Sequence, residues 1–156
     1  MTALVIGIDG GGSKTTALVA DAQGQAIVEV AGAPSAVRSG GVDASADAIV
    51  ALVRAALAQA GRDETPQVVC AGVAGTGRES LRLELWEALT ARGIADEVVV
   101  HTDVAVAFED AFPHGPGILL LAGTGSVALG RGPTGVTARC GGWGADFGDE
   151  GGGAWT

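Results

Sequence analysis

The residues most able to do chemistry in this chain lie in short glycine-rich turns that follow apolar segments. The first turn, GIDGGGSKT at residues 7–15, combines one acid with three successive glycines, two hydroxyl side chains and a lysine. Glycines let a backbone approach an anion closely and adopt positive φ, so that successive N–H groups form an anion-binding nest. We therefore predict a phosphate site here. Its predicted ligands are Gly11, Gly12, Ser13, Lys14 and Thr15.

Two common nucleotide-binding motifs are excluded for this stretch. A Walker A loop needs lysine directly after its second glycine and leads into a helix, whereas Ser13 precedes Lys14 and a strand-like segment follows. The Rossmann pattern fails because Ser13 stands where a glycine is required. What remains is a strand–turn–strand hairpin with Asp9 at its mouth, where the carboxylate would bind Mg²⁺ directly or through water. The alternative is a structural hairpin with a solvated Lys14 and a turn-capping Asp9.

A second turn of the same kind occurs at LAGTGS, residues 121–126. Two such turns at the ends of core strands predict a clamp on a polyphosphate from two sides. The alternative for this turn alone is a hairpin built from small residues. The predicted phosphate ligands are Gly123, Thr124, Gly125 and Ser126.

Acidic residues after these turns are candidates for the acceptor site. Asp103 in VVVHTDVAVAFEDAF follows a strand-like segment and begins a helical one, so that Thr102 or Asp103 can cap the helix. Asp103 can equally act as a general base that accepts the proton of an attacking hydroxyl. The closing stretch CGGWGADFGDEGGG, residues 140–153, holds three acids among glycines. Such a loop is either mobile or organised around a ligand.

Composition limits the class of protein. A chain of 156 residues with 47% hydrophobic residues can form one domain with a real core. A formal net charge of -9 makes nucleic-acid binding unfavourable. No apolar run approaches the roughly 18 residues of a membrane span, and no signal peptide is recognisable, so a cytoplasmic protein is expected. Cys70 and Cys140 lack metal-binding spacing and are expected to be reduced, buried thiols.

Hydrophobic periodicity predicts the elements that must position these residues. The expected order is three strands, then helix–strand twice, then a helix and three further strands. This order implies a mixed five-stranded central sheet with helices on its faces. Asp43 or Ser45 is expected to cap the first helix, and Thr76 with Glu79 to form a capping box for the second. Strands are expected at 3–8, 15–21, 26–32, 67–75, 97–101, 117–123, 126–132 and 135–141, and helices from about 43 to 60, 79 to 92 and 102 to 111.

Four stretches together resemble a known family. GIDGGGSKT, HTDVAVAFEDAF, LLLAGTGSVALG and CGGWGADFGDEGGG are similar, in order and spacing, to the signatures of the N-acetylglucosamine kinase branch of the sugar kinase, Hsp70 and actin superfamily, also called the BadF/BadG ATPase family. The resemblance implies an α/β, RNase H-like (actin-like ATPase) domain with sheet order 3-2-1-4-5 and helices on both faces. It also implies that residues 1–156 form the N-terminal lobe, with a C-terminal lobe outside this chain.

The same resemblance implies an ATP- and Mg²⁺-dependent phosphorylation of a sugar hydroxyl, on N-acetylglucosamine, glucosamine or a related hexose. The two turns correspond to the first and second phosphate-binding loops, and Asp103 to the catalytic base. The implied partners are the sugar and the protein's own C-terminal lobe, and a homodimer is left open. The implied substrate-binding residues are Asp103, Gly141, Gly142, Trp143, Asp149 and Glu150.

One position departs from the family pattern and keeps alternatives open. Ala36 stands where family members with sugar-kinase activity commonly carry an asparagine that contacts the substrate. The identity of the sugar is therefore in doubt, whereas the kinase assignment is not. Two other functions remain: a non-catalytic module that senses a nucleotide or sugar, and a BadF-type ATPase that activates a dehydratase through an iron–sulfur cluster. The second requires cysteines beside the second phosphate loop, which Cys70 and Cys140 do not provide.

Overall fold

The computed structural model describes residues 3–38, 41–144 and 148–153 of the chain. The described elements follow one another in the predicted order. The strands are β1 (Leu4–Gly10), β2 (Thr15–Asp21), β3 (Ala26–Gly32), β4 (Val68–Val73), β5 (Glu97–His101), β6 (Gly117–Ala122), β7 (Ser126–Arg131) and β8 (Thr137–Gly141). The helices are α1 (Val42–Gln59), α2 (Glu79–Ala91) and α3 (Asp103–Ala111). Within these described ranges, no helix has the length and apolar character needed to span a bilayer.

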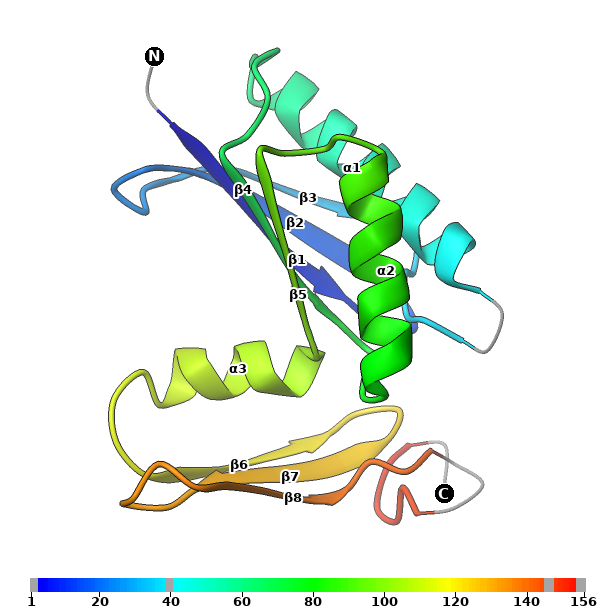
Figure 1. Cartoon of the computed structure of the whole chain (residues 1–156), viewed down its shortest axis with the longest axis vertical. Helices are drawn as coiled ribbons and strands as arrows, with labels where there is room; N and C mark the ends of the chain where they lie inside the picture. Colours follow the sequence, from blue (N-terminus) through cyan, green and yellow to red (C-terminus); the bar gives the residue numbers. More distant parts are fainter. Residues whose placement is uncertain (1–2, 39–40, 145–147, 154–156) are drawn as a thin grey trace. The chain divides into compact units, whose positions relative to one another are not determined.

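The chain divides into two compact units, the first ending at Asp103 and the second starting at Val104. The first unit contains a five-stranded sheet in the order β3-β2-β1-β4-β5 (Figure 1). The first three strands form an antiparallel meander, and β4 and β5 run parallel to β1. The mixed sheet and its 3-2-1-4-5 order are therefore confirmed. Helices α1 and α2 lie on one face of this sheet (Figure 1), and α3 belongs to the second unit from its second residue onward.

The core of the first unit lies between the sheet and the two helices. In β1 the side chains of Leu4, Ile6 and Ile8 are buried, whereas the residues between them face the other side and are more exposed. The helices contribute fully buried residues such as Ile49 of α1 and Leu85 of α2. Burial of these aliphatic side chains is the main favourable contribution to folding. It also holds the parallel strands of the sheet in a fixed register.

The predicted side-chain caps of α1 and α2 are wrong, because neither helix start has a side-chain cap hydrogen bond. Asp43 lies inside the first turn of α1, after the cap position. The Ser45 hydroxyl donates to the Ser35 carbonyl oxygen at 2.5 Å, and the Thr76 hydroxyl donates to the Val73 carbonyl oxygen at 2.6 Å. Both hydroxyls are buried, and a buried hydroxyl bonds whichever carbonyl the tertiary fold brings within reach.

The second unit contains an antiparallel sheet in the order β6-β7-β8, on which α3 packs through the buried Phe108. The Arg131 guanidinium of β7 lies over the Phe108 ring, with 4.9 Å between its carbon and the ring centroid. It also donates to the Glu109 carboxylate at 2.9 Å and to the Phe112 carbonyl oxygen. These contacts tie the helix to the sheet that carries the second glycine turn.

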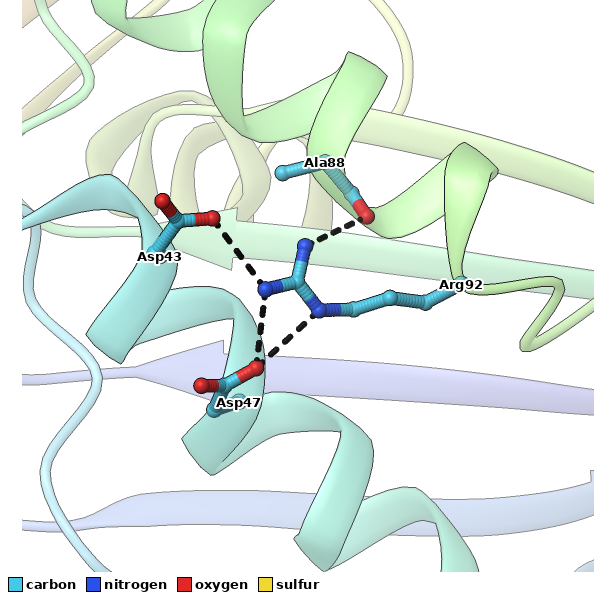
Figure 2. Close-up of polar contacts among 4 residues, drawn as sticks. All are labelled: Asp43, Asp47, Ala88 and Arg92. Atoms are coloured by element: carbon cyan, nitrogen blue, oxygen red, sulfur yellow. Dashed lines mark hydrogen bonds and ion pairs between the residues drawn. The ribbon is translucent and has the colours of Figure 1, made fainter.

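One arginine joins the two helices of the first unit (Figure 2). Arg92, which follows α2, donates to the Asp47 carboxylate through Nε and Nη2, at 3.0 and 2.8 Å, and to Asp43 at 3.1 Å. Its Nη1 group donates to the Ala88 carbonyl oxygen at 2.9 Å. The hydrogen bonds to Asp47 and then to Asp43 raise the pKa of Arg92 above its ordinary value. A raised pKa means that this stabilisation is present below the ordinary arginine pKa and is lost only as the pH rises through the raised value.

Replacing Arg92 with alanine is expected to lower the melting temperature by about 1–4 °C, because partly exposed ion pairs contribute little. Salt screens such pairs, so the difference from wild type should shrink in about 1 M NaCl. The difference should be constant between pH 8 and pH 10, roughly, because arginine stays charged there. Thermal unfolding followed by circular dichroism measures the melting temperature, its dependence on salt and its dependence on pH. Arg62→Ala is the control, because Arg62 pairs at 3.3 Å with the nearby Glu64 and joins no two elements. Equal losses of melting temperature for the Arg92 and Arg62 variants would contradict the role of Arg92 in joining the two helices.

Candidate active site

The first glycine turn joins β1 to β2. The Gly11 N–H donates to the Lys14 carbonyl oxygen at 3.0 Å, and a Cβ atom on Gly11 would lie only 2.9 Å from that oxygen. The turn therefore needs glycine at this position. The Gly11 carbonyl oxygen accepts N–H groups from both Ser35 and Ala36, each at 3.2 Å. Because the C=O and N–H of a trans peptide point in opposite directions, the Gly12 N–H points away from Ser35 and Ala36.

Three backbone donors in this turn are free. The N–H groups of Gly12, Ser13 and Lys14 donate to no acceptor among the described residues, and the side chains of Ser13 and Lys14 are exposed. Such a run of donors can bind a phosphate oxygen. The expectation of positive φ in this turn is wrong, because Gly10, Gly11 and Gly12 all lack it. Glycine is required at Gly11 for close approach to the Lys14 backbone and at Gly10 for close approach to the Ser35 side chain, whereas nothing lies within 4 Å of a Cβ atom on Gly12.

Thr15 differs from its predicted role as a side-chain donor to phosphate. Its side chain is fully buried, and its hydroxyl donates to the Ser35 hydroxyl oxygen at 2.8 Å. The Thr15 backbone pairs with Gly10 in the sheet. The hydroxyl therefore fastens the turn to the segment that follows β3, and any contact with a ligand falls to the exposed residues before it.

The register of the sheet brings two predicted acids to the same edge. Asp9 of β1 lies opposite Gly72 of β4, and Gly72 lies opposite His101 of β5. Since neighbouring strands lie about 4.8 Å apart, the Cα atoms of Asp9 and His101 are about 10 Å apart. Asp103 follows two residues later as the first residue of α3. The carboxyl ends of parallel strands are the usual ligand-binding edge of an α/β sheet. The first turn, Asp9 and Asp103 therefore share this edge.

The donors at this edge fit one kind of metal ion. No cluster of three or more His, Cys, Asp or Glu side chains suited to a metal occurs in the part of the chain that the structure describes. Asp9 is a single exposed carboxylate. Mg²⁺ keeps several of its waters and binds one or two carboxylates together with phosphate oxygens. Asp9 at the end of the strand that leads into the predicted phosphate turn is compatible with that mode of binding.

The second glycine turn joins β6 to β7 in the second unit. The Gly123 N–H donates to the Gly125 carbonyl oxygen at 2.8 Å, and Thr124 between them is exposed. The Ser126 hydroxyl donates to the Glu150 carbonyl oxygen at 2.8 Å. The Ser126 proton is therefore used within the protein, and Thr124 is the exposed hydroxyl residue of this turn.

The closing stretch at residues 140–153, called the acidic loop from here on, packs through its last glycines on this second turn. Sequence reasoning missed this contact. The Gly153 N–H donates to the Gly123 carbonyl oxygen at 2.7 Å. A Cβ atom on Gly152 would lie 2.7 Å from the Gly125 Cα atom, so only glycine allows this approach. The signal that could have indicated it is the run of glycines at 151–153, which follows the acids of the loop.

Asp149 is held against the second turn in an unusual way. A Cβ atom on Gly125 would lie 2.5 Å from Asp149 Oδ2, so the carboxylate occupies the space that a side chain would need. Asp149 Oδ1 is buried and has no hydrogen-bond partner among the described residues. A buried carboxylate oxygen without a partner is unfavourable, because it has lost water and gained nothing in exchange. A ligand hydroxyl that donates to Oδ1 would remove this cost.

The remaining predicted substrate residues lie at the end of β8 and in the acidic loop. Gly141 and Gly142 have φ of 72° and 70°, a left-handed conformation that favours glycine. Arg139 donates from Nη2 to the Gly142 carbonyl oxygen at 2.7 Å, and its guanidinium lies 6.0 Å from the centroid of the Trp143 ring. Trp143 is 68% exposed, so its indole is free to stack on a ligand. Glu150 is exposed.

The predicted residues thus form two groups. Asp9, the first turn and Asp103 come together in the first unit. The second turn, residues 141–143, Asp149 and Glu150 belong to the second unit. Their joint use of one triphosphate and one sugar stays a prediction.

Two further features lie apart from these groups. A cavity of about 140 Å³ lies where β4 and β5 begin, at the edge of the sheet opposite to Asp9. It contains none of the predicted site residues. The cavity is lined by Val53, Arg54, Leu57, Asp63, Glu64, Thr65, Pro66, Arg92, Gly93 and Ile94. Cys70 and Cys140 are both free thiols, but the prediction that they are buried is wrong, because Cys140 is exposed and Cys70 is only partly buried. Partial burial raises the pKa of Cys70, so this thiol is less reactive near neutral pH.

Comparison with known proteins gives one family and a consistent set of relatives. Residues 6–156 match the BadF/BadG/BcrA/BcrD ATPase family. The chain is 33% identical over 150 residues to an N-acetylmuramic acid/N-acetylglucosamine kinase of Clostridium acetobutylicum. It is 32% identical over 161 residues to an N-acetyl-D-glucosamine kinase of Dictyostelium discoideum. Each alignment covers 96% of this chain, and the chain spans 49% and 50% of the two relatives.

A solved structure agrees with these relatives. A Chromobacterium violaceum protein, provisionally assigned as an N-acetylglucosamine kinase, superposes with a TM-score of 0.83 at 30% identity. The superposition covers 99% of this chain and 54% of that one. The chain therefore corresponds to about half of each relative's length.

Proposed function

Because the chain belongs to the BadF/BadG/BcrA/BcrD ATPase family, we propose that it is part of an ATP-dependent kinase that phosphorylates a hydroxyl of an amino sugar. The observation that carries the proposal is the set of groups at the carboxyl ends of the parallel strands in the first unit. There, three backbone N–H groups that have no acceptor among the described residues follow Asp9 in the turn after β1, and Asp103 follows the parallel strand β5. A phosphate site, a metal ligand and a carboxylate base are the parts that phosphoryl transfer requires.

In this proposal the turns bind the nucleotide. The free N–H groups of Gly12, Ser13 and Lys14 bind phosphate oxygens, and the second turn contributes Gly123, Thr124 and Gly125. Lys14 adds a positive charge on a flexible, exposed stem. Asp9 holds Mg²⁺ through its carboxylate or through coordinated water. When bound, Mg²⁺ neutralises part of the phosphate charge.

Asp103 is the proposed general base. Its carboxylate accepts the proton of the sugar hydroxyl while the hydroxyl oxygen forms a bond to the γ-phosphorus of ATP. The bond from that phosphorus to the β–γ bridging oxygen breaks, and ADP leaves with the electron pair. Asp103 is only partly buried, so a substrate can reach it.

The acidic loop is the proposed sugar-binding segment. The unpartnered Asp149 Oδ1 supports this role, because a sugar hydroxyl is a donor of the right kind. The exposed indole of Trp143 can cover the apolar face of a sugar ring, and Glu150, Gly141 and Gly142 complete the predicted group. N-acetylglucosamine is the first candidate substrate, since it is named for both relatives. Ala36 replaces the asparagine expected in this family, so glucosamine and related hexoses remain candidates.

The experiment that tests the proposal measures ADP release by the intact protein with Mg·ATP and a panel of sugars. The panel contains N-acetylglucosamine, N-acetylmuramic acid, glucosamine and glucose. We expect one amino sugar to raise ADP release at least tenfold above the rate without sugar, with formation of the sugar phosphate confirmed by mass spectrometry. ATP binding without stimulation by any sugar would instead favour the nucleotide-sensing module. Iron and a brown colour after anaerobic purification would favour the dehydratase-activating ATPase.

A further inference from the structure

We propose that Ser35 is a positioning residue for the nucleotide phosphates and acts through the peptide bond between Gly11 and Gly12. This inference rests on the proposed function, because it concerns the phosphate site of the first turn. Neither the family resemblance nor the predicted site residues assign a role to Ser35. Its side chain is 2% exposed, so it cannot touch the ligand itself.

Ser35 is the centre of a buried polar network at the carboxyl edge of the sheet. Its hydroxyl oxygen accepts the Thr15 hydroxyl at 2.8 Å, and its carbonyl oxygen accepts the Ser45 hydroxyl of α1 at 2.5 Å. Its N–H donates to the Gly11 carbonyl oxygen at 3.2 Å. A Cβ atom on Gly10 would lie 2.6 Å from Ser35 Oγ, so the serine is pressed against the start of the turn.

The segment around Ser35 is fixed on its other side as well. The Val37 N–H donates to the Ala74 carbonyl oxygen at 2.8 Å, and the Ala74 N–H donates to the Gly10 carbonyl oxygen at 2.8 Å. A Cβ atom on Gly75 would lie 2.0 Å from the Val37 carbonyl oxygen, which leaves no room for a side chain there. The loop after β3, the loop after β4 and the first turn are thus bonded to one another.

This network decides which way the Gly11–Gly12 peptide faces. A peptide between two glycines can rotate with little steric cost, and its two orientations present either an N–H or a C=O to a ligand. A C=O in that place would repel a phosphate. The Ser35 and Ala36 N–H groups hold the Gly11 oxygen on the protein side, which leaves the Gly12 N–H free to donate outward. Ser35 thereby prepares a donor before the nucleotide arrives.

The test uses the intact protein and measures its affinity for Mg·ATP by isothermal titration calorimetry without sugar. Ser35→Ala and Thr15→Val each remove the hydrogen bond between the two hydroxyls. Both variants keep the Ser35 and Ala36 N–H groups but lose the side-chain bond that anchors their segment to the turn. We expect each variant to bind Mg·ATP about tenfold more weakly, because the segment then holds the Gly11 oxygen less firmly and the Gly12 N–H is less well oriented. The double variant should bind Mg·ATP no more weakly than the weaker-binding single variant, because the two substitutions remove the same hydrogen bond. Ser35→Thr retains the hydroxyl and should restore affinity.

The stability control is Ile49→Val, which shortens a fully buried side chain of α1 and removes no hydrogen-bonding group of the network. It should lower the melting temperature by an amount similar to Ser35→Ala and leave the affinity for Mg·ATP unchanged. If Ser35→Ala and Thr15→Val bind Mg·ATP as wild type does, the positioning role is overturned while the proposed function stands. If the wild-type protein itself does not bind Mg·ATP, the proposed function fails and this inference fails with it.

Discussion

Asp103→Asn is expected to lower kcat for sugar phosphorylation by about 10²–10⁴-fold, the usual contribution of a general base. The KM for ATP should change little, because the proposed phosphate contacts lie in the glycine turns. Asparagine caps a helix as well as aspartate does, so a capping role at the start of α3 would survive the substitution. A loss of activity at unchanged melting temperature therefore separates the base from the cap. Steady-state kinetics and thermal unfolding of the same preparation measure both quantities.

The matched control is Asp110→Asn, which removes an exposed carboxylate from the other end of the same helix. It should leave kcat at the wild-type value. The role of Asp103 is refuted if the asparagine variant phosphorylates its sugar at the wild-type rate. A parallel fall in melting temperature and activity would instead mean that the Asp103 carboxylate stabilises the fold, and the loss of activity would then not identify a base.

Asp149→Asn is expected to lower kcat/KM for the sugar by about 10- to 100-fold, since a hydrogen bond to a charged group is replaced by one to a neutral amide. The same substitution should raise the melting temperature of the protein without substrate. The reason is that Asp149 Oδ1 is buried without a partner, and a neutral group costs less to bury than a carboxylate. An opposite change in activity and stability is the signature of a residue kept for binding.

Asp110→Asn serves here as the stability control, because it removes an equal charge from an exposed position of the second unit. Its melting temperature should match that of wild type. A lower melting temperature for Asp149→Asn would mean that the carboxylate stabilises the fold, and the proposed contact with the sugar would lose its physical basis.

Local patterns were sufficient for most of the fold. The limits of β2 and β3 agree with the predicted 15–21 and 26–32, because alternating aliphatic residues bounded by turn residues specify a strand within a few residues of chain. The sheet order agrees with the one implied by the family resemblance. β1 runs to Gly10, two residues beyond the predicted end, because Asp9 and Gly10 pair with Thr16 and Thr15. That extension depends on a partner strand.

Hydroxyl side chains were the weakest part of the prediction. Thr15 and Ser126 were assigned to phosphate, and Ser45 and Thr76 to helix caps. In the structure each donates to another part of the protein, to Ser35, Glu150, Ser35 and Val73 respectively. A hydroxyl accepts many partners at similar energy, so its choice depends on which group the fold brings near. Sequence spacing carries no such information.

The amino-acid sequence by itself indicated where the proposed chemistry lies, because glycine clusters and acids at strand ends are local features that can be recognised without the fold. Tertiary structure alone decided how those groups are presented. The Gly11–Gly12 peptide faces outward because a segment more than 20 residues away holds its oxygen. Asp149 Oδ1 finds no partner among the described residues because the acidic loop packs on the second turn. Both depend on contacts between distant residues, which only the packing of the whole unit creates.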